Sequence, residues 1–216
     1  MDNETKLIPK TFFWMFLGLL GTAIMAWYTY SSGLFLRVLL TDSFNILLVV
    51  EIVVVLLFSF LFKKLPPTIV GILYFIYAMI NGVSMAVIFY VFELSSIIYL
   101  FIASAVLFGG LALYGYKTKK DLSSWHTVLF GVLIVGLILS VINLFMGNSM
   151  LDIVLDWVIL LVFFGITMYD MNKIKNLQYE EGLDQAKLHI YGAMELYLDF
   201  INIFLRMLSI FAKRRD

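Results

Sequence analysis

The segment Met194–Arg206 reads MELYLDFINIFLR, and the interpretation of the whole chain starts from it. Polar residues interrupt its apolar run at spacings of four, three and four: Glu195, Asp199, Asn202 and Arg206. This spacing places all of them on one stripe of a single helix. A carboxylate at the centre of a bilayer costs roughly 2.5–3.5 kcal/mol on insertion scales. If this helix crosses a membrane, Asp199 therefore requires a partner, a water-filled cavity or a function.

The composition is that of an integral membrane protein. Of the 216 residues, 62% are hydrophobic and 14% are charged, and the mean hydropathy is +0.99. Soluble domains have about 45–50% apolar and about 25% charged residues. The formal net charge is zero, so no global field directs the chain to nucleic acid. There is no cysteine and there are only 2 histidines, which excludes thiolate metal sites and argues against a histidine-rich one.

Seven apolar stretches predict an all-α membrane protein with seven transmembrane helices. Each has a length within the range of about 17–25 residues that a spanning helix needs. They cover residues 11–28, 44–62, 68–92, 96–116, 124–146, 150–169 and 188–212. The connections between them are short, so we predict a single seven-helix transmembrane domain over residues 1–216.

The basic residues predict a cytoplasmic N-terminus. Through the first six stretches, this orientation leaves only Arg37 in the outer loops. It collects ten lysines on the inner side: Lys6, Lys10, Lys63, Lys64, Lys117, Lys119, Lys120, Lys173, Lys175 and Lys187. The connection Asn172–Lys187 carries charges of both signs and is predicted to be a solvated loop. The last stretch leaves two alternatives open: a full crossing, which we favour, or a re-entrant helix that keeps the basic tail inside.

Other polar side chains also fall within the predicted spans. Four of them are best explained as hydrogen-bonding contacts between helices: Asn81, Ser84, Ser140 and Asn143. Asp152 and Asp156 lie one turn apart near the outer end of the sixth stretch. These two acids can lie among the lipid headgroups or form an outer mouth that attracts cations.

Asp170 and Asp199 are the acids for which a purely structural role is hardest to accept. Asp170 follows the sixth stretch directly, and Asp199 lies about 16 Å into the seventh, which enters from the same side. Their carboxylates can meet if one helix boundary shifts by a few residues. Two carboxylates in a low-dielectric site cannot both ionise comfortably, so they titrate as a unit. Such a pair can share a proton, admit a cation after releasing it, or only tie two helices together.

Two motifs resemble the Bax inhibitor-1 family, also called the transmembrane Bax inhibitor motif family. They are MYDMNKIK at the end of the sixth stretch and ELYLDFINIFLRML in the seventh. The most specific residues are Tyr169-Asp170 and the run Leu196–Asn202. Further support comes from Glu51, Asn81-Gly82 and Lys119–Leu122. The compact form with short loops looks like the bacterial calcium-leak members of that family.

The resemblance implies a central seventh helix surrounded by the other six. It also implies a pair of aspartates that senses pH on a calcium-permeable path. Asp170 and Asp199 match that pair, and they would hold calcium weakly and transiently. In bacterial relatives an arginine at the inner end of the second helix binds the pair in the closed state. Here the same region offers Lys63 and Lys64, which are point charges without the bidentate fork of a guanidinium.

Further residues are predicted to belong to the same calcium-permeable path. Glu51, Glu195 and Asn202 are predicted to line the path, and Arg206 is predicted to pair with an acid such as Glu51 or Asp156. Calcium, a hard cation that takes several oxygen ligands, is the permeant ion, and no cofactor is expected. We expect a monomer in the bacterial plasma membrane, whose partners are the lipid bilayer, Ca²⁺ and H⁺.

The predicted function is a pH-sensitive calcium leak and not an enzyme. A proton–calcium antiporter would use the same acids, and a regulator of membrane proteases or cell-death proteins would act through surfaces that sequence does not reveal; both alternatives stay open. An intramembrane aspartic protease would need Gly-x-Gly-Asp at the second acid, whereas Tyr197 and Leu198 precede Asp199. It would also need a Pro-Ala-Leu loop, whereas no proline follows Pro67.

Overall fold

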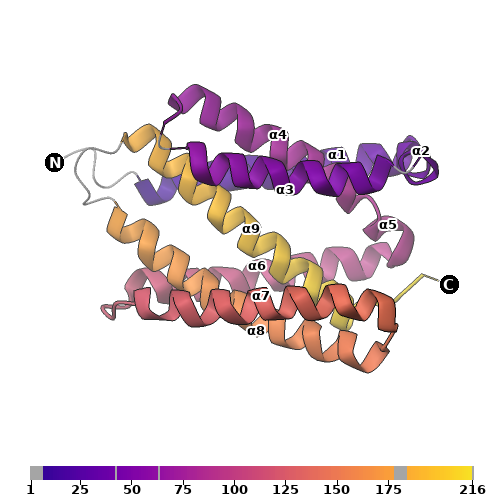
Figure 1. Cartoon of the computed structure of the whole chain (residues 1–216). Helices are drawn as coiled ribbons and strands as arrows, with labels where there is room; N and C mark the ends of the chain where they lie inside the picture. Colours follow the sequence, from indigo (N-terminus) through magenta and orange to yellow (C-terminus); the bar gives the residue numbers. More distant parts are fainter. Residues whose placement is uncertain (1–6, 42, 63, 178–183, 216) are drawn as a thin grey trace. The chain divides into compact units, whose positions relative to one another are not determined.

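Long α-helices account for nearly all of the chain that the structure describes (Figure 1). The structure is a computed structural model, and it describes residues 7–41, 43–62, 64–177 and 184–215. The helices are α1 (Leu7–Ser31), α2 (Leu34–Leu40), α3 (Ser43–Leu61), α4 (Pro67–Met85), α5 (Ile88–Val91), α6 (Leu94–Lys117), α7 (Ser123–Met146), α8 (Ser149–Leu177) and α9 (Gln185–Phe211). Gly33 before α2 and Gly147 after α7 have φ values of 70° and 62°, a left-handed conformation that glycine adopts without steric cost.

Five helical segments of the described chain are long and apolar enough to cross a membrane. They are α1, the segment Pro67–Val91 that contains α4 and α5, α6, α7 and α8. Their outward side chains are large and apolar; on α7, Leu144 is 81% and Phe145 is 89% exposed. Such extensive apolar surface suits contact with lipid. The chain is therefore an all-α membrane protein.

The helices α3 and α9 fall outside that set. In α3 the apolar segment that the structure describes is shorter, Val49–Leu61. In α9 the polar residues Glu195, Asp199 and Asn202 lower the mean hydropathy. The prediction of seven spans stays a prediction.

The predicted third stretch, residues 68–92, is not one uninterrupted helix. It divides into α4 and α5. Between these helices the backbone hydrogen bonds join residues three apart, as in a 3₁₀ turn. The Ala86 N–H donates to the Val83 carbonyl at 3.3 Å, and the Val87 N–H to the Ser84 carbonyl at 3.4 Å. The prediction also missed α2, which lies in the connection between the first two stretches.

The sixth stretch extends further than predicted. Hydropathy ends it at residue 169, but α8 continues to Leu177, so the predicted loop beginning at Asn172 is wrong up to that point. The polar side chains of this extension bond to carbonyls at the end of α6. Asn172 Nδ2 donates to the Gly115 carbonyl at 3.3 Å, and Lys175 Nζ donates to those of Tyr116 and Thr118, both at 3.0 Å. Helix C-terminal carbonyls have no partner within their own helix, so these bonds satisfy them and stabilise the extension.

The contacts divide the chain into two compact units. The first unit contains residues 1–91, 178–197 and 215, and the second contains residues 92–177, 198–214 and 216. The first therefore holds α1 to α5, and the second holds α6 to α8. The division falls inside α9, between Tyr197 and Leu198, so this helix contributes its first half to one unit and its second half to the other.

In the first unit, α1 packs closely against α4. A Cβ atom added at Gly82 would lie 2.7 Å from the Thr22 carbonyl oxygen, so only glycine allows this approach of the two backbones. At Gly18 of α1, the space that a side chain would occupy is filled by the ring of Tyr74. Tyr74 is fully buried, and its hydroxyl donates to the Trp14 carbonyl at 3.0 Å. Hydrogen bonding of the hydroxyl makes this burial of a tyrosine favourable.

In the second unit, α6 packs against both α8 and the second half of α9. A Cβ atom at Gly115 would lie 2.3 Å from the Met168 carbonyl oxygen, which again marks a backbone contact that requires glycine. Phe200 of α9 packs edge-to-face on Phe101 and Phe108 of α6, with ring centroids 5.2 and 5.7 Å apart.

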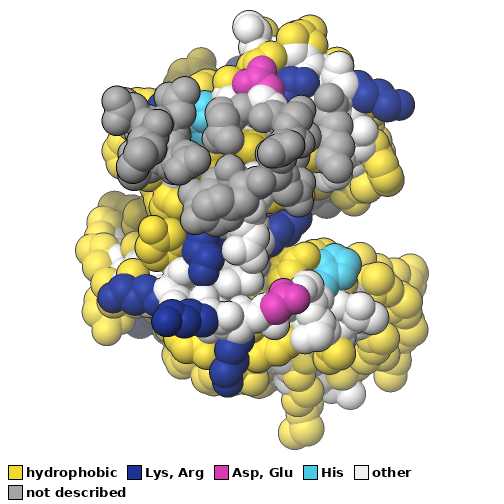
Figure 2. Space-filling model, turned by 90° about the vertical axis from the view of Figure 1, so that its left-hand side faces the viewer, with side chains coloured by type: hydrophobic (Ala, Val, Ile, Leu, Met, Phe, Trp, Pro, Cys, Tyr) yellow, Lys and Arg dark blue, Asp and Glu magenta, His cyan; other side chains and the backbone are white. Residues whose placement is uncertain are grey.

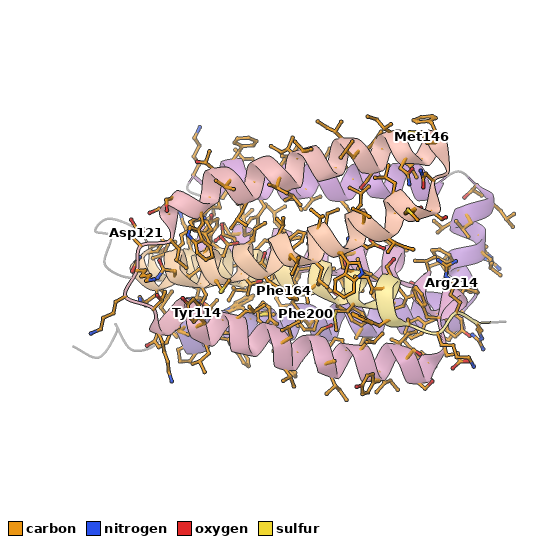
Figure 3. All side chains as sticks on the ribbon, turned by 90° about the horizontal axis from the view of Figure 1, so that it is seen from below. Tyr114, Asp121, Met146, Phe164, Phe200 and Arg214 are labelled. Atoms are coloured by element: carbon orange, nitrogen blue, oxygen red, sulfur yellow. The ribbon has the colours of Figure 1, made fainter. Side chains whose placement is uncertain are left out.

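Within the second unit, α9 runs antiparallel to α6. The Glu93 N–H before α6 donates to the Lys213 carbonyl after α9 at 3.1 Å, and the two side chains form an ion pair. The C-terminal end of α9 thus lies beside the N-terminal end of α6. Figure 3 shows Asp121, after α6, toward one end of this unit and Met146 and Arg214 toward the opposite end.

Candidate functional site

The two aspartates singled out by the sequence are both buried in the second unit. Asp170 is 6% exposed and Asp199 is 2% exposed. Because α8 continues to Leu177, Asp170 lies inside the helix, about two turns from its end, and not at a helix boundary. A carboxylate inside a membrane protein is costly unless it is neutralised or solvated. Both side chains are therefore candidates for a function.

The helix positions next to both acids contact α6. On α8, Met168 and Asn172 flank Asp170 and lie against Gly115. On α9, Phe200 follows Asp199 and packs against Phe108. Phe108 and Gly115 are about 10 Å apart along α6. Phe200 also packs against Phe101, so the α8 segment is held against the C-terminal end of α6 and the α9 segment against its middle. Figure 3 shows Phe200 between the two ends of the unit.

A second buried acid of this unit, Asp156, is engaged in an ion pair. Its Oδ1 accepts a hydrogen bond from Arg206 Nη1 at 2.5 Å, and its Oδ2 accepts one from the Ser209 hydroxyl. Of the two acids considered for Arg206, the structure places Asp156 against it. This contact sets the register of α8 against α9 in the second unit.

The other acid of the proposed outer mouth, Asp152, is exposed and lies in the first turn of α8. Its carboxylate accepts a hydrogen bond from Asn143 Nδ2 at 2.5 Å. The Asn143 amide also bonds the backbone of Asn148 in both directions, at 2.9 and 3.2 Å. Asn143 therefore joins the end of α7 to the start of α8, as expected for a structural polar residue.

The polar interior of the first unit consists mainly of neutral groups. The Tyr197 hydroxyl of α9 lies 2.7 Å from the Thr22 hydroxyl of α1 and donates to Asn81 Oδ1 of α4 at 3.1 Å. One turn after Asn81, the Ser84 hydroxyl donates to Glu51 Oε1 of α3 at 2.6 Å. One face of α4 thus contacts the polar side chains of three other helices.

Two further predicted path residues bond within α9. Glu195 accepts a hydrogen bond from the Tyr191 hydroxyl, and Asn202 Nδ2 donates to the Leu198 carbonyl at 2.8 Å. Of the two lysines considered for the latch, Lys63 lies outside the described residues, and Lys64 is exposed.

A resident metal site is not assembled among the described residues, because no group of three or more His, Cys, Asp or Glu side chains there could hold a metal ion. Calcium takes six to eight oxygen ligands.

Sequence reasoning missed three partners of the polar groups: Tyr197, Thr22 and Ser209. Tyr197 is two residues from both Glu195 and Asp199, so it lies on the opposite side of α9 from their stripe. The signal available was a tyrosine within an apolar helix, since a buried tyrosine hydroxyl usually finds a hydrogen-bond partner. Thr22 and Ser209 carry no such signal, because single hydroxyl residues are common in membrane helices.

Basic residues gather where α6 ends and α7 begins. Lys117, Lys119 and Lys120 are exposed there, and Figure 2 shows Lys and Arg side chains on the face that contains this end. Asp121 lies in the same connection. Hydrogen bonds from the Ser123 hydroxyl and from its backbone N–H, the latter at 2.9 Å, lower the pKa of the Asp121 carboxyl.

These features define an α-helical membrane protein that spans the bilayer several times and buries carboxylates within one of its two units. A comparison with protein families gives a match over residues 4–216 to the family model described as "Inhibitor of apoptosis-promoting Bax1". The chain belongs to the Bax inhibitor-1 family.

Several bacterial relatives match most of the chain. The chain is 34% identical over 214 residues to the "Inner membrane protein YbhL" of Escherichia coli K12, and the match covers 96% of this chain and 92% of the relative. It is 32% identical over 219 residues to the "Uncharacterized protein RP147" of Rickettsia prowazekii, and the match covers 100% of this chain and 92% of the relative. It is also 32% identical over 166 residues to the "Uncharacterized membrane protein SpyM3_0260" of Streptococcus pyogenes, and the match covers 76% of this chain and 72% of the relative.

Proposed function

We propose that this protein is a pH-sensitive calcium leak of the bacterial plasma membrane, gated by Asp170 and Asp199. The observation that carries the proposal is the burial of both carboxylates, at 6% and 2% exposure, on helix segments that both pack against α6. Calcium is a hard cation that selects carboxylate and carbonyl oxygens. The relatives named as membrane proteins support the location in the bacterial membrane.

The proposed arrangement has seven spans, with α9 at the centre and the N-terminus in the cytoplasm. Three observations support a full crossing by α9. Its 27 residues correspond to about 40 Å, more than the roughly 30 Å of a bilayer core. Most residues of its middle are buried, including Leu196, Tyr197 and Phe200. Its C-terminal end lies beside the N-terminal end of α6 at Glu93, opposite the lysines that follow α6.

The proposed gate works through the charge of the two carboxylates. Protonation removes negative charge, so it weakens both the attraction for calcium and the hold on a cationic side chain, the role for which the sequence offers Lys63 and Lys64. Deprotonation restores the acceptor oxygens that a partly hydrated calcium needs. The acids titrate as a unit if they interact, and the flux then follows the titration of the pair.

Calcium flux into proteoliposomes tests this function directly. The wild-type protein should show a flux that depends on pH, and Asp170→Asn and Asp199→Asn should each flatten this dependence, since an amide does not titrate. Asp121→Asn is the matched control, because Asp121 is an exposed acid in a connection between helices. A flux that is indifferent to both substitutions would rule out the proposed gate.

The same preparation separates the alternatives. An antiporter would take up calcium against its gradient when a proton gradient is imposed, whereas a leak moves calcium only down its gradient. A role in binding other proteins would persist in the Asp170→Asn/Asp199→Asn double variant after flux is lost.

A further inference from the structure

The first unit contains an apolar groove of about 750 Å³ that is open on one side. Its walls come from α1, α4 and the first turns of α9. Aromatic rings form part of its wall, where Trp14 packs on Phe75 and His189 with ring centroids 5.4 and 6.2 Å away. The lining residues are Trp14, Pro67, Thr68, Gly71, Ile72, Phe75, Ile76, Met79, Ile80, Ala186, His189 and Ile190.

The length of the groove corresponds to one leaflet of a bilayer. On α4 its lining begins at Pro67, the first residue of the helix, and ends at Ile80. This distance is about 20 Å along the helix, while half of a bilayer core is about 15 Å thick. Ile72 and Ile76 are 53% and 44% exposed, so the open side presents apolar side chains to the lipid. The groove thus extends from a helix end toward the middle of the membrane.

Positive charge lies at the end of the groove where α4 begins. Lys10 precedes Trp14 by one turn of α1, and Lys64 precedes Pro67 by three residues; both lysines are exposed. Lys187 lies between the lining residues Ala186 and His189. The described acid at this end, Asp184, accepts a hydrogen bond from the Ala186 N–H at 2.8 Å and caps α9. An apolar groove with lysines at its membrane-surface end is complementary to a lipid with an anionic headgroup.

We propose that this groove binds one acyl chain of an anionic phospholipid, from the leaflet on the N-terminal side, with Lys10 and Lys64 at the phosphate. Trp14 then lies beside the upper part of the chain. The site belongs entirely to the first unit and does not depend on the proposed calcium leak.

The fluorescence of Trp14 tests this binding. The full chain carrying Trp27→Phe, Trp125→Phe and Trp157→Phe retains Trp14 as its single tryptophan and is reconstituted in vesicles. Phospholipids with brominated acyl chains quench a tryptophan that they contact. At equal and low mole fraction, brominated phosphatidylglycerol should quench Trp14 at least twofold more than brominated phosphatidylcholine. Lys10→Gln/Lys64→Gln should remove this preference and leave the quenching by phosphatidylcholine unchanged. Equal quenching by the two lipids in the parent protein would overturn the proposal.

A second variant tests occupation of the groove itself. A Cβ atom at Gly71 would lie 3.4 Å from the Trp14 ring, an ordinary contact, so Gly71→Leu should fold and fill the groove. The matched control is Gly109→Leu on α6, where nothing lies within 4 Å. Quenching by brominated phosphatidylglycerol should fall at least twofold in Gly71→Leu and stay unchanged in Gly109→Leu. Quenching that rises when the ratio of protein to lipid is lowered would instead indicate that a second copy of the chain occupies the groove, and would overturn the lipid site.

Discussion

The interiors of the two units hold polar groups of different kinds. In the first unit, neutral hydroxyl and amide groups of Tyr197, Thr22 and Asn81 bond to one another, and a single hydroxyl donates to the half-buried Glu51 carboxylate at its edge. In the second, full charges are buried, as Asp156 with Arg206, and the buried acids Asp170 and Asp199 lie on the helices that this ion pair joins. The helix α9 supplies side chains to both interiors.

The difference has a physical consequence. A neutral hydrogen-bonded group costs little to bury and holds a helix at a defined position without responding to pH. A buried charge must be paired or hydrated, and it responds to protons and cations. We infer that the neutral contacts of the first unit position α9, and the proposed gate of Asp170 and Asp199 belongs to the second unit. The following experiments test this division, from the largest expected effect to the smallest.

The ion pair of the second unit should contribute most to stability. Asp156→Ala removes the carboxylate that faces Arg206 and should lower the free energy of unfolding by about 3 kcal/mol. This is the lower end of the range for buried pairs, because 34% of the Arg206 side chain is accessible. Denaturant unfolding in detergent micelles measures it. The double variant Asp156→Leu/Arg206→Met should recover most of the loss, and an equal loss in the double variant would contradict the ion-pair explanation.

In each unit, one glycine at a close contact between two helices should be important for stability. Gly82→Ala in the first unit and Gly115→Ala in the second place a methyl group 2.7 and 2.3 Å from a backbone oxygen. Each should lower the free energy of unfolding by about 1–3 kcal/mol, as overpacking does. Gly110→Ala is the control, since nothing lies within 4 Å of its Cβ position, and it should be neutral or stabilise by up to about 1 kcal/mol. Equal effects at all three positions would show that glycine flexibility matters and that close contact does not.

The neutral network should affect stability without affecting ion flux. Tyr197→Phe removes only the hydroxyl that bonds Thr22 and Asn81, so unfolding should be easier by about 1 kcal/mol while the pH-dependent calcium flux persists. The exposed Tyr99 provides the control, because Tyr99→Phe should change neither quantity. If Tyr197→Phe abolished the pH dependence of flux, the division between a positioning unit and an ion-handling unit would be wrong.

The smallest effect is expected at Asp121, outside the spans. Hydrogen bonds from Ser123 lower the pKa of this carboxyl. Its stabilising contribution is therefore present above the ordinary pKa of an aspartate and is lost as the pH falls through the lowered value. Ser123→Ala should raise the pKa of Asp121 part of the way back, as measured by titration of the carboxyl signal in NMR. Ser124→Ala should leave it unchanged, and an equal shift in both variants would exclude the Ser123 hydroxyl as the cause.

The sequence predicted the apolar helices well because the bilayer imposes a simple rule of length and hydropathy on them. It failed where polar groups find partners within the protein. Asn172 and Lys175 looked like loop residues, yet their bonds to the end of α6 continue α8 to Leu177. The break between α4 and α5 was missed for the opposite reason, since hydropathy does not detect a turn that tightens within an apolar segment.

For the candidate site, sequence identified the acids but not their surroundings. The cost of a carboxylate in an apolar helix is a property of one residue in its segment, so Asp170, Asp199 and Asp156 stand out without a structure. The choice of Asp156 for Arg206 depends on the register of α8 against α9, which no local pattern encodes. The role of Tyr197 depends in the same way on how α9 is rotated against α1 and α4.

Composition and periodicity by themselves thus determined the class of protein, the approximate helices and the stripe of polar residues on α9. The tertiary structure decided which of those residues are neutralised by a partner, which helix faces are closed by glycine contacts, and where a lipid-sized groove remains open. The reason is physical: hydropathy accumulates over neighbouring residues of one segment, whereas ion pairs, hydrogen bonds and grooves arise only between segments that are distant in the chain.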